Sequence, residues 1–262
     1  MRALHTAATG MMAQELNVQV ISNNIANMRT TGYKRQRAEF QDMLYEHVRR
    51  VGTQTSAQGN VLPAGVELGS GVKTVGTPRI MSQGTLLPTQ KEMDVAVRGE
   101  GFFRVLMPDG RTAYTRDGSF ELDSQGRIVT AQGNVVNPGL TIPPNATGVT
   151  INAGGQVSAT LPGATAPTTV GQIQIAMFIN KAGLQGIGDN LYLETPASGT
   201  PQVGNPNSDA FGNLQQGNLE QANVEAVSEI SDLIAAQRAY EMNAKVSSAA
   251  DQMLQSSSQM MR

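Results

Sequence analysis

Residues 4–28 read LHTAATGMMAQELNVQVISNNIANM, and their apolar side chains recur at intervals of seven positions. One row consists of Leu4, Met11, Val18 and Ile25. A second row, three positions later, contains Ala7, Ile21 and Met28, with Gln14 as its polar member. A seven-residue repeat of this kind is typical of an α-helix that packs in a coiled coil. The sequence therefore predicts a long N-terminal helix, and Met12, Leu16 and Val20 widen its apolar surface beyond what one partner helix needs.

A second helical pattern occupies the other end of the chain, at about residues 223–261. Its seven-residue row contains Leu233, Tyr240 and Leu254, and the neighbouring row contains Ile230 and Ala244. Asn223 is expected to cap the first turn, because its side chain can accept hydrogen bonds from free backbone N–H groups. Such a helix would be about 55 Å long, since each residue adds about 1.5 Å. We therefore expect the two terminal helices to pair as a coiled coil and to contact other copies of the chain.

The region between the helices contains short strand patterns separated by turn sequences. Residues 102–106 and 111–115 flank Pro108-Asp109-Gly110, which is a hairpin signal. Two further hairpins are expected at residues 120–129 and 149–158, and two further strands at residues 173–177 and 191–193. The regular spacing of these strands favours a small antiparallel β barrel or sandwich.

Residues 46–75 differ from both the helices and the strand region. They run from Glu46 and Arg50, through Leu62 and Pro63, to the alternating Val66-Glu67-Leu68. The segment has too few apolar residues to form a core of its own. We interpret it as an extended hairpin arm that is stable only against another surface, with a flexible linker as the alternative.

Composition excludes several classes of function. Charged residues make up 15% of the chain, against a usual level of about 25%. The net charge is −2 with no basic stripe, so nucleic acid is not an expected partner. No apolar run approaches the ~20 residues that span a bilayer, and the polar residues near the N-terminus argue against a cleaved secretory signal. The chain has no cysteine, which excludes disulfides and cysteine metal sites.

Catalytic chemistry has little support in the sequence. The two histidines, His5 and His47, have no further metal-binding residues at ligand spacing. The glycine pairs of residues 69–71 and 99–101 do not follow the pattern of a nucleotide-binding loop, and we interpret them as turns or bulges. We therefore expect no catalytic residue, no metal and no cofactor, and we treat an enzyme with helical ends as the competing class.

These patterns together predict an α+β chain with long terminal helices, an extended hairpin arm and a central antiparallel β domain. The expected segments are residues 1–40 for the N-terminal helix and junction, 41–75 for the arm, 76–216 for the β domain and 217–262 for the C-terminal helix. Residues 1–40 and 217–262 are expected to form one helical domain.

Residues 21–35, ISNNIANMRTTGYKR, resemble the signature of bacterial flagellar rod and hook proteins. The runs 217–229, GNLEQANVEAVSE, and 233–245, LIAAQRAYEMNAK, are similar to the C-terminal hallmark of that family, and 97–103, VRGEGFF, to its β domain. The resemblance marks these residues of the first motif: Asn23, Asn24, Asn27, Thr31, Gly32, Tyr33 and Lys34. For Lys34, Arg35 and Arg37 two interpretations stay open, a solvated helix end or a polar clamp on a neighbouring subunit.

The resemblance implies a structural subunit rather than an enzyme. Length and the arm make the chain most similar to the distal rod subunits of the family, with a proximal rod or hook subunit as the alternative. The implied partners are other copies of the chain in a helical homopolymer, proximal rod proteins, the hook protein, the L-ring and P-ring proteins and the flagellar type III export apparatus. The implied location is the rod of the flagellar basal body in the periplasm, reached without a cleaved signal and without membrane insertion.

Overall fold

The computed structural model describes residues 2–49, 64–163, 166–208 and 210–260. Contacts within the chain divide it into two compact units. Unit 1 comprises residues 1–25, 36–78 and 225–262, and unit 2 comprises residues 26–35 and 79–224. The chain therefore passes between the units more than once, and short connecting segments at residues 26–35 and 217–224 belong to unit 2.

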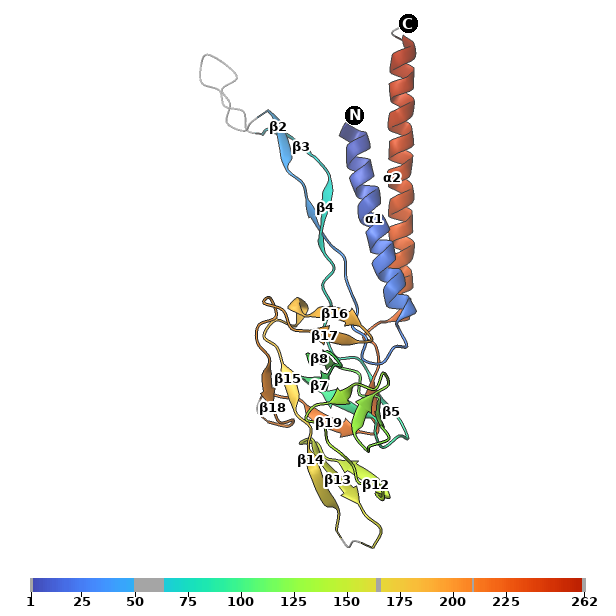
Figure 1. Cartoon of the computed structure of the whole chain (residues 1–262). Helices are drawn as coiled ribbons and strands as arrows, with labels where there is room; N and C mark the ends of the chain where they lie inside the picture. Colours follow the sequence, from blue (N-terminus) through green and yellow to red (C-terminus); the bar gives the residue numbers. More distant parts are fainter. Residues whose placement is uncertain (1, 50–63, 164–165, 209, 261–262) are drawn as a thin grey trace. The chain divides into compact units, whose positions relative to one another are not determined.

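Unit 1 contains two long helices, α1 (Arg2–Ala26) and α2 (Ala226–Met260), which confirms the expectation of a helix at each end (Figure 1). The helices run antiparallel. Asn24 on α1 donates a hydrogen bond to Glu229 near the start of α2, whereas Gly10 near the other end of α1 lies against Asn243. These two contacts lie two heptads apart on both helices, so the seven-residue spacing is kept in the contact itself.

The prediction that Asn223 caps the second helix is wrong. The helix begins three residues later, at Ala226. The Asn223 side chain instead accepts a hydrogen bond from the Arg35 N–H at 2.7 Å and donates to the Ile80 carbonyl at 2.8 Å. These partners lie within unit 2 and occupy the atoms that would otherwise cap α2.

Unit 1 also contains two antiparallel strand pairs. Strand β1 (Glu39–Asp42) pairs with β4 (Val72–Gly76), and β2 (Tyr45–Arg49) pairs with β3 (Val66–Gly69). All residues of β2 and β3 are exposed. Hydrogen bonds hold this ribbon together, but a two-stranded ribbon with both faces in water is only marginally stable by itself.

Unit 2 is almost entirely β structure. Its strands are β5 (Leu86–Pro88), β6 (Val95–Arg98), β7 (Phe102–Leu106), β8 (Thr112–Thr115), β9 (Phe120–Leu122), β10 (Ile128–Thr130), β11 (Val135–Val136), β12 (Gly148–Ile151), β13 (Gln156–Thr160), β14 (Thr168–Gln172), β15 (Ile175–Met177), β16 (Gln185–Gly188), β17 (Leu191–Leu193), β18 (Gln202–Gly204), β19 (Asn213–Gln216) and β20 (Asn218–Glu220). A 3₁₀ turn, Lys181–Gly183, precedes β16. The three hairpins expected from turn sequences are present as β7–β8, β9–β10 and β12–β13.

The strands of unit 2 form several open sheets. The largest has nine strands in the order β16-β17-β8-β7-β11-β10-β9, with β15 and β18 joined at β7. The smaller sheets are β12-β13-β14, β19-β6 and β20-β5. The prediction of a barrel is wrong, because the described strands leave β9 and β16 as free edges. Closing a sheet into a barrel requires a consistent tilt and stagger of all its strands. The short strands of this sheet, in which β15 pairs with β7 outside the main strand order, do not provide it.

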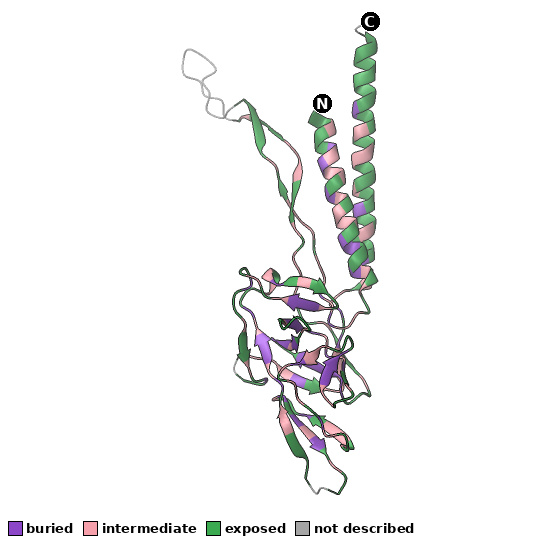
Figure 2. Cartoon of the chain, viewed as in Figure 1, coloured by how far each residue is buried: buried purple, intermediate pink, exposed green. Residues whose placement is uncertain are grey.

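The core of unit 2 explains why its strands form. Side chains from β6, β7, β9, β10, β13 and β15 pack into one apolar cluster that includes Phe103 and Phe120, both fully buried. The rings of these two residues meet edge to face, with centroids 4.9 Å apart. A second cluster surrounds Phe102 and Phe178. Figure 2 shows this concentration of buried residues in the β strands.

Candidate assembly sites

The Thr-Gly-Tyr-Lys turn of the first motif is held within unit 2 by a backbone contact that only glycine allows. Gly32 has φ +68°, and a Cβ atom on it would lie 2.7 Å from the backbone nitrogen of Asp117. Its N–H donates to the Glu220 carbonyl at 2.8 Å, while the Thr31 carbonyl accepts from Asn190 at 2.9 Å. A side chain at position 32 would therefore push the turn away from the residues that hold it.

Lys34, at the end of this turn, forms a buried ion pair with Glu220. Neither side chain has any exposed surface. The Lys34 Nζ donates to Glu220 Oε1 at 2.5 Å and to the Ser82 carbonyl at 2.8 Å. The same Oε1 accepts from the Gly84 N–H at 2.8 Å. The pair therefore joins three separate chain segments at one point.

Arg116 is the third charged member of this cluster. Its Nη1 lies 3.7 Å from Glu220 Oε2, and its guanidinium donates to the carbonyls of Val97 and Gly99 at 3.2 and 2.7 Å. The guanidinium also lies over the Phe102 ring, 5.4 Å from its centroid. Arg116 thereby ties the ion pair to the β core.

Two buried cations face one carboxylate in this cluster, and their burial has the largest effect on their pKa values. Burial lowers the pKa of Lys34 below its ordinary value of 10.5; Glu220 opposes this shift and Arg116 adds to it. Burial likewise lowers the pKa of Arg116. The cluster, which we call the junction cluster (Lys34, Arg116 and Glu220), is suited to fixing the position of the connecting segments.

Both interpretations of Lys34 drawn from the sequence are wrong. The side chain is neither solvated nor available to a neighbouring subunit, because it is enclosed by its own chain. Sequence reasoning also missed Glu220 and Arg116 as its partners. The signal for Glu220 was present, since the second family motif places one acid among uncharged residues at 217–224; nothing in the spacing pointed to Arg116.

The other motif residues occupy different positions. Asn24 is buried in unit 1, where its Oδ1 accepts from the Gln36 N–H at 3.0 Å and its Nδ2 donates to the Gln36 carbonyl at 2.8 Å and to Glu229 Oε2 at 3.1 Å. Asn23 is exposed. Asn27 is half-buried and accepts a hydrogen bond from Thr30, and Tyr33 is half-buried. The motif therefore serves both units, with Asn24 in one and Lys34 in the other.

On α2 the contact with α1 uses a different heptad row from the two expected ones, whereas on α1 Ala7 and Ile21 of the expected second row are buried. On α2 the row that faces α1 is Glu229, Ala236, Asn243 and Ala250, of which Glu229, Ala236 and Ala250 are buried. Opposite it, a Cβ atom on Gly10 would lie 2.8 Å from Asn243 Nδ2. Small and polar residues thus permit a close approach of the helices, and larger side chains at these positions would separate them.

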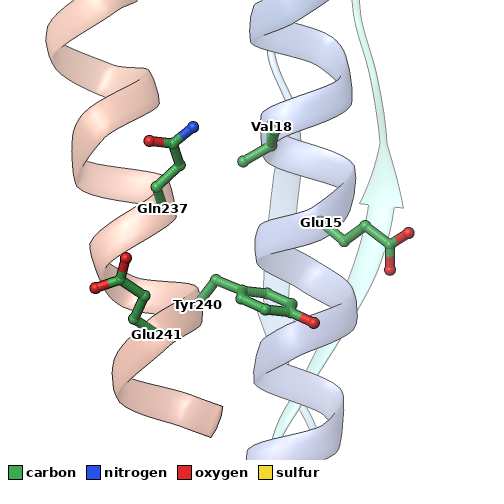
Figure 3. Close-up of a pocket in the computed structure, with 5 residues that line it drawn as sticks. All are labelled: Glu15, Val18, Gln237, Tyr240 and Glu241. Carbon is green, nitrogen blue, oxygen red and sulfur yellow. The ribbon is translucent and has the colours of Figure 1, made fainter.

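The seam residues expected from the sequence lie beside this contact. Leu4, Met11, Val18 and Ile25 are all half-buried, as is Leu233. By contrast, Ile230, Tyr240 and Leu254 are 49%, 44% and 43% exposed. A groove of about 440 Å³ opens between the helices at this side, lined by Glu15, Val18, Gln237, Tyr240 and Glu241 (Figure 3). In it Val18 and the Tyr240 ring lie between the two glutamates.

The arm is anchored to α1 at its base. Glu46 accepts from Arg2 at 2.7 Å, and Thr9 Oγ1 accepts from the Val72 N–H at 3.4 Å. Gly71, with φ +114°, allows the contact between Val72 and Thr9, because a Cβ atom at position 71 would clash with Thr9 Oγ1 at 2.3 Å. Arg50, Leu62 and Pro63, the other residues expected to act in the arm, lie outside the described residues.

The described part of the chain offers no site for metal chemistry. It contains no group of three or more histidine, aspartate or glutamate side chains that could hold a metal ion. His47 pairs with Glu67 across the arm, at 3.1 Å between Nδ1 and Oε1. Neither helix, over the residues described, is long and apolar enough to cross a membrane.

Comparisons with known families cover both ends and the middle of the chain. Residues 4–34 match the family described as flagella basal body rod protein, and residues 215–260 match the flagellar basal body rod FlgEFG protein C-terminal family. Residues 96–159 match the flagellar hook protein FlgE/F/G D1 domain. The first two matches contain Lys34 and Glu220, which meet in the junction cluster.

Individual relatives separate rod from hook. The chain is 56% identical to the flagellar basal-body rod protein FlgG of Caulobacter vibrioides over 99% of both chains. It is 48% identical to FlgG of Agrobacterium fabrum over 97% of both chains. The flagellar hook protein FlgE of Helicobacter pylori is 41% identical, but over 52% of this chain and 19% of the hook protein.

Proposed function

The chain belongs to the FlgG family of flagellar basal-body rod proteins, and on that basis we propose that it polymerises helically into the hollow distal shaft that transmits torque from the motor to the hook. The observation that carries this proposal is the match to rod relatives over nearly the whole of both chains. As a member of this family it is a structural protein of motility and not an enzyme. The hook alternative has weaker support, because the hook relative matches only a small part of its own length.

Self-assembly is supported by the surface of α2. Val227, Ile234, Met253 and Met260 are all more than half exposed, at 74%, 54%, 67% and 83%. Burying a large apolar side chain contributes about 1.5–3 kcal/mol. Such exposed residues along one long helix therefore favour contacts with further copies, and contacts that repeat by a rotation that does not close produce a filament.

We propose that the two helices pair as a coiled coil and that such pairs pack lengthwise around the channel of the shaft. The heptad spacing of the contacts at Gly10–Asn243 and Asn24–Glu229 supports this pairing. The functional segments we propose are residues 1–40, 41–75, 76–216 and 217–262, with the junction cluster holding residues 30–35 and 217–224 against the β domain. Asn23, Asn27 and Tyr33 are then assigned to contacts made in the assembled shaft.

The arm is proposed to stiffen the shaft by lying across neighbouring subunits. The support is that β2 and β3 pair with each other yet remain exposed on both faces, including Tyr45, Val48 and Leu68 at 51%, 59% and 44%. Removal of residues 47–63 should leave export intact and give a more flexible or curved rod. A straight, fully rigid rod from this variant would refute the role of the arm.

The remaining partners are proposed from the position of a distal rod. They are the type III export apparatus before assembly, proximal rod proteins below, the hook protein above and the L-ring and P-ring proteins around the shaft. Export without a cleaved signal and a periplasmic location belong to the same proposal. Site-specific photocrosslinking from exposed positions of unit 2 such as Ile179 would identify ring contacts.

The proposed function is tested by imaging detached basal bodies. We expect electron cryo-microscopy to place this chain in the straight shaft between proximal rod and hook, and deletion of its coding sequence to end the rod before that level. A map that places the chain only in the hook, or a deletion strain with a complete rod, would overturn the proposal.

A further inference from the structure

One expected heptad row of α1 and one expected heptad row of α2 lie on the same side of the helix pair. On α2 each residue of this row, which is Ile230, Gln237 and Ala244, comes one position after a residue of the row that contacts α1. On α1 the row Met11, Val18 and Ile25 likewise comes one position after the row that contains Gly10 and Asn24. One position turns a helix by about 100°. Because the helices are antiparallel, equal turns bring both rows to one side, where Val18 and Gln237 indeed line the same groove.

This groove has the composition of a helix-binding surface. Its lining contains Val18, the ring of Tyr240 and the amide of Gln237, and the carboxylates of Glu15 and Glu241 lie on either side (Figure 3). Tyr240 is 44% exposed, and Ile230, in the neighbouring heptad row, is 49% exposed. A partly apolar groove with charged margins can accept an amphipathic helix, whose apolar side chains enter the groove and whose charges meet the margins.

We propose that this groove binds α2 of a second copy of the chain, through the segment around Met242 and Lys245. Met242 is 61% exposed and Val246 is 50% exposed, so this segment has apolar side chains to insert. Lys245 follows Met242 by three positions and therefore shares its face of the helix. This inference rests on the proposed self-assembly and specifies which helix faces meet.

Charge favours this segment over the end of α2. Glu15 has no ion-pair partner among the described residues, and Lys245 likewise has none there, so the two complement each other between copies. Glu241 already lies 3.8 Å from Arg238 of its own helix. The end of α2 at residues 251–260 also exposes Met253 and Met260, but its one charged residue is Asp251, which the acidic groove would repel.

Cysteine pairs test the docking directly, because the chain contains no cysteine of its own. The full-length Val18→Cys/Met242→Cys variant is assembled and then oxidised. Position 242 lies beside residue 11 in the antiparallel register of one chain, about 10 Å along the axis from residue 18, so a disulfide must join two copies. We expect a ladder of covalent oligomers. The matched controls are each single variant, Val18→Cys/Glu121→Cys and Val18→Cys/Met253→Cys, which should give no ladder.

Charge exchange provides the second part of the test. Glu15→Lys should raise the concentration needed for assembly by roughly tenfold or more, because it places like charges together. Adding Lys245→Glu should restore assembly, whereas the control Glu121→Lys, on the exposed surface of unit 2, should assemble normally. The β-sheet circular dichroism of unit 2 should be unchanged in all variants.

The outcomes separate this inference from the proposed function. Assembly without a Val18–Met242 link, or a link to Met253 in its place, would overturn the docking and leave the distal-rod role intact. If neither the unmodified chain nor any variant assembles, both are wrong. A Val18–Met242 ladder with rescue by the charge exchange would establish the contact.

Discussion

Unit 2 buries a continuous apolar core with Phe103, Phe120 and Ile175 fully enclosed, whereas the buried residues of the α2 helix in unit 1 are Glu229, Ala236 and Ala250. The contrast is visible in Figure 2, where most of α2 is exposed. Unit 2 has the surface burial of an independent domain. In unit 1, α1 buries Val20 and Ile21, but most of the larger apolar side chains of α2 are exposed, so we expect much of its packing energy to come from other copies of the chain. The same chain thus combines a part that is complete alone with a part that becomes complete on assembly.

The largest expected difference between the units is their protection from hydrogen exchange. In dilute monomer we expect amides of β6 and β7 to exchange only through global unfolding, which costs about 5–15 kcal/mol in ordinary domains. Amides in both terminal helices should exchange at nearly the free rate, because so little of their surface is buried. Exchange measured by mass spectrometry at micromolar concentration checks this.

The assembled polymer is the control for that experiment, since docking on other copies should protect both helices. If the helices of the monomer were protected as strongly as β6 and β7, unit 1 would be stable alone and the contrast between the units would be wrong.

The next effect concerns the junction cluster of unit 2. Glu220→Ala leaves Lys34 and Arg116 buried without their shared carboxylate, and the loss of one partner of a buried pair costs about 3–5 kcal/mol. Urea unfolding of the monomer measures this loss. The double variant Lys34→Met/Glu220→Gln should recover part of it, because it removes one buried cation together with the carboxylate charge. A Glu220→Ala protein as stable as the original would show that the cluster does not hold unit 2 together.

Lys34 also makes the stability of unit 2 depend on pH. Its pKa in the folded chain is below the ordinary 10.5, so between the two values the unfolded chain binds more protons. The free energy of unfolding therefore rises with pH between these two pKa values. The contribution of Lys34 is complete above 10.5 and is lost as the pH falls through the folded-state pKa. The slope for one proton is at most about 1.4 kcal/mol per pH unit.

The pH effect is isolated by comparing two variants. Lys34→Met should abolish this slope, while Lys91→Met, at a half-exposed lysine, should keep it. Urea titrations between neutral and alkaline pH measure both. A slope that persists in Lys34→Met would assign the effect to another group.

The hairpins of unit 2 were accessible from sequence because their signals are local. Pro108-Asp109-Gly110 specifies a turn, and Gly110 has the positive φ, +84°, that such a turn needs. The branched open sheet was not accessible, because strand order beyond the hairpins depends on long-range packing. The same applies to the junction cluster, whose Lys34 and Glu220 stand at opposite ends of the chain and share no local pattern.

The helices were predicted correctly in type, but the row that joins them was not. Counting apolar residues identifies the rows with the largest side chains, such as Val18 and Ile230. The contact within the chain uses Gly10 and Ala236, whose small size allows a close approach, together with Asn243, which lies against Gly10. The apolar heptad pattern therefore identifies side chains, such as Val18 and Ile230, that lie beside the contact between the two helices. We assign the surface that they form to contacts between copies.

The smallest effect on the monomer is expected from an exposed residue of α2, and it sharpens the comparison most. Ile234→Ala removes a side chain that is 54% exposed, so the monomer should lose no more than about 0.5 kcal/mol. The matched change Ile175→Ala, at a fully buried residue of unit 2, should cost about 2–5 kcal/mol.

In assembly the order of the two effects reverses, because Ile234→Ala weakens a contact between copies whereas any Ile175→Ala protein that folds retains its helix surfaces. Urea unfolding and sedimentation of the polymer measure the two properties on the same samples. Equal destabilisation of the monomer by both changes would mean that the isolated chain already covers Ile234, and that unit 1 does not depend on other copies.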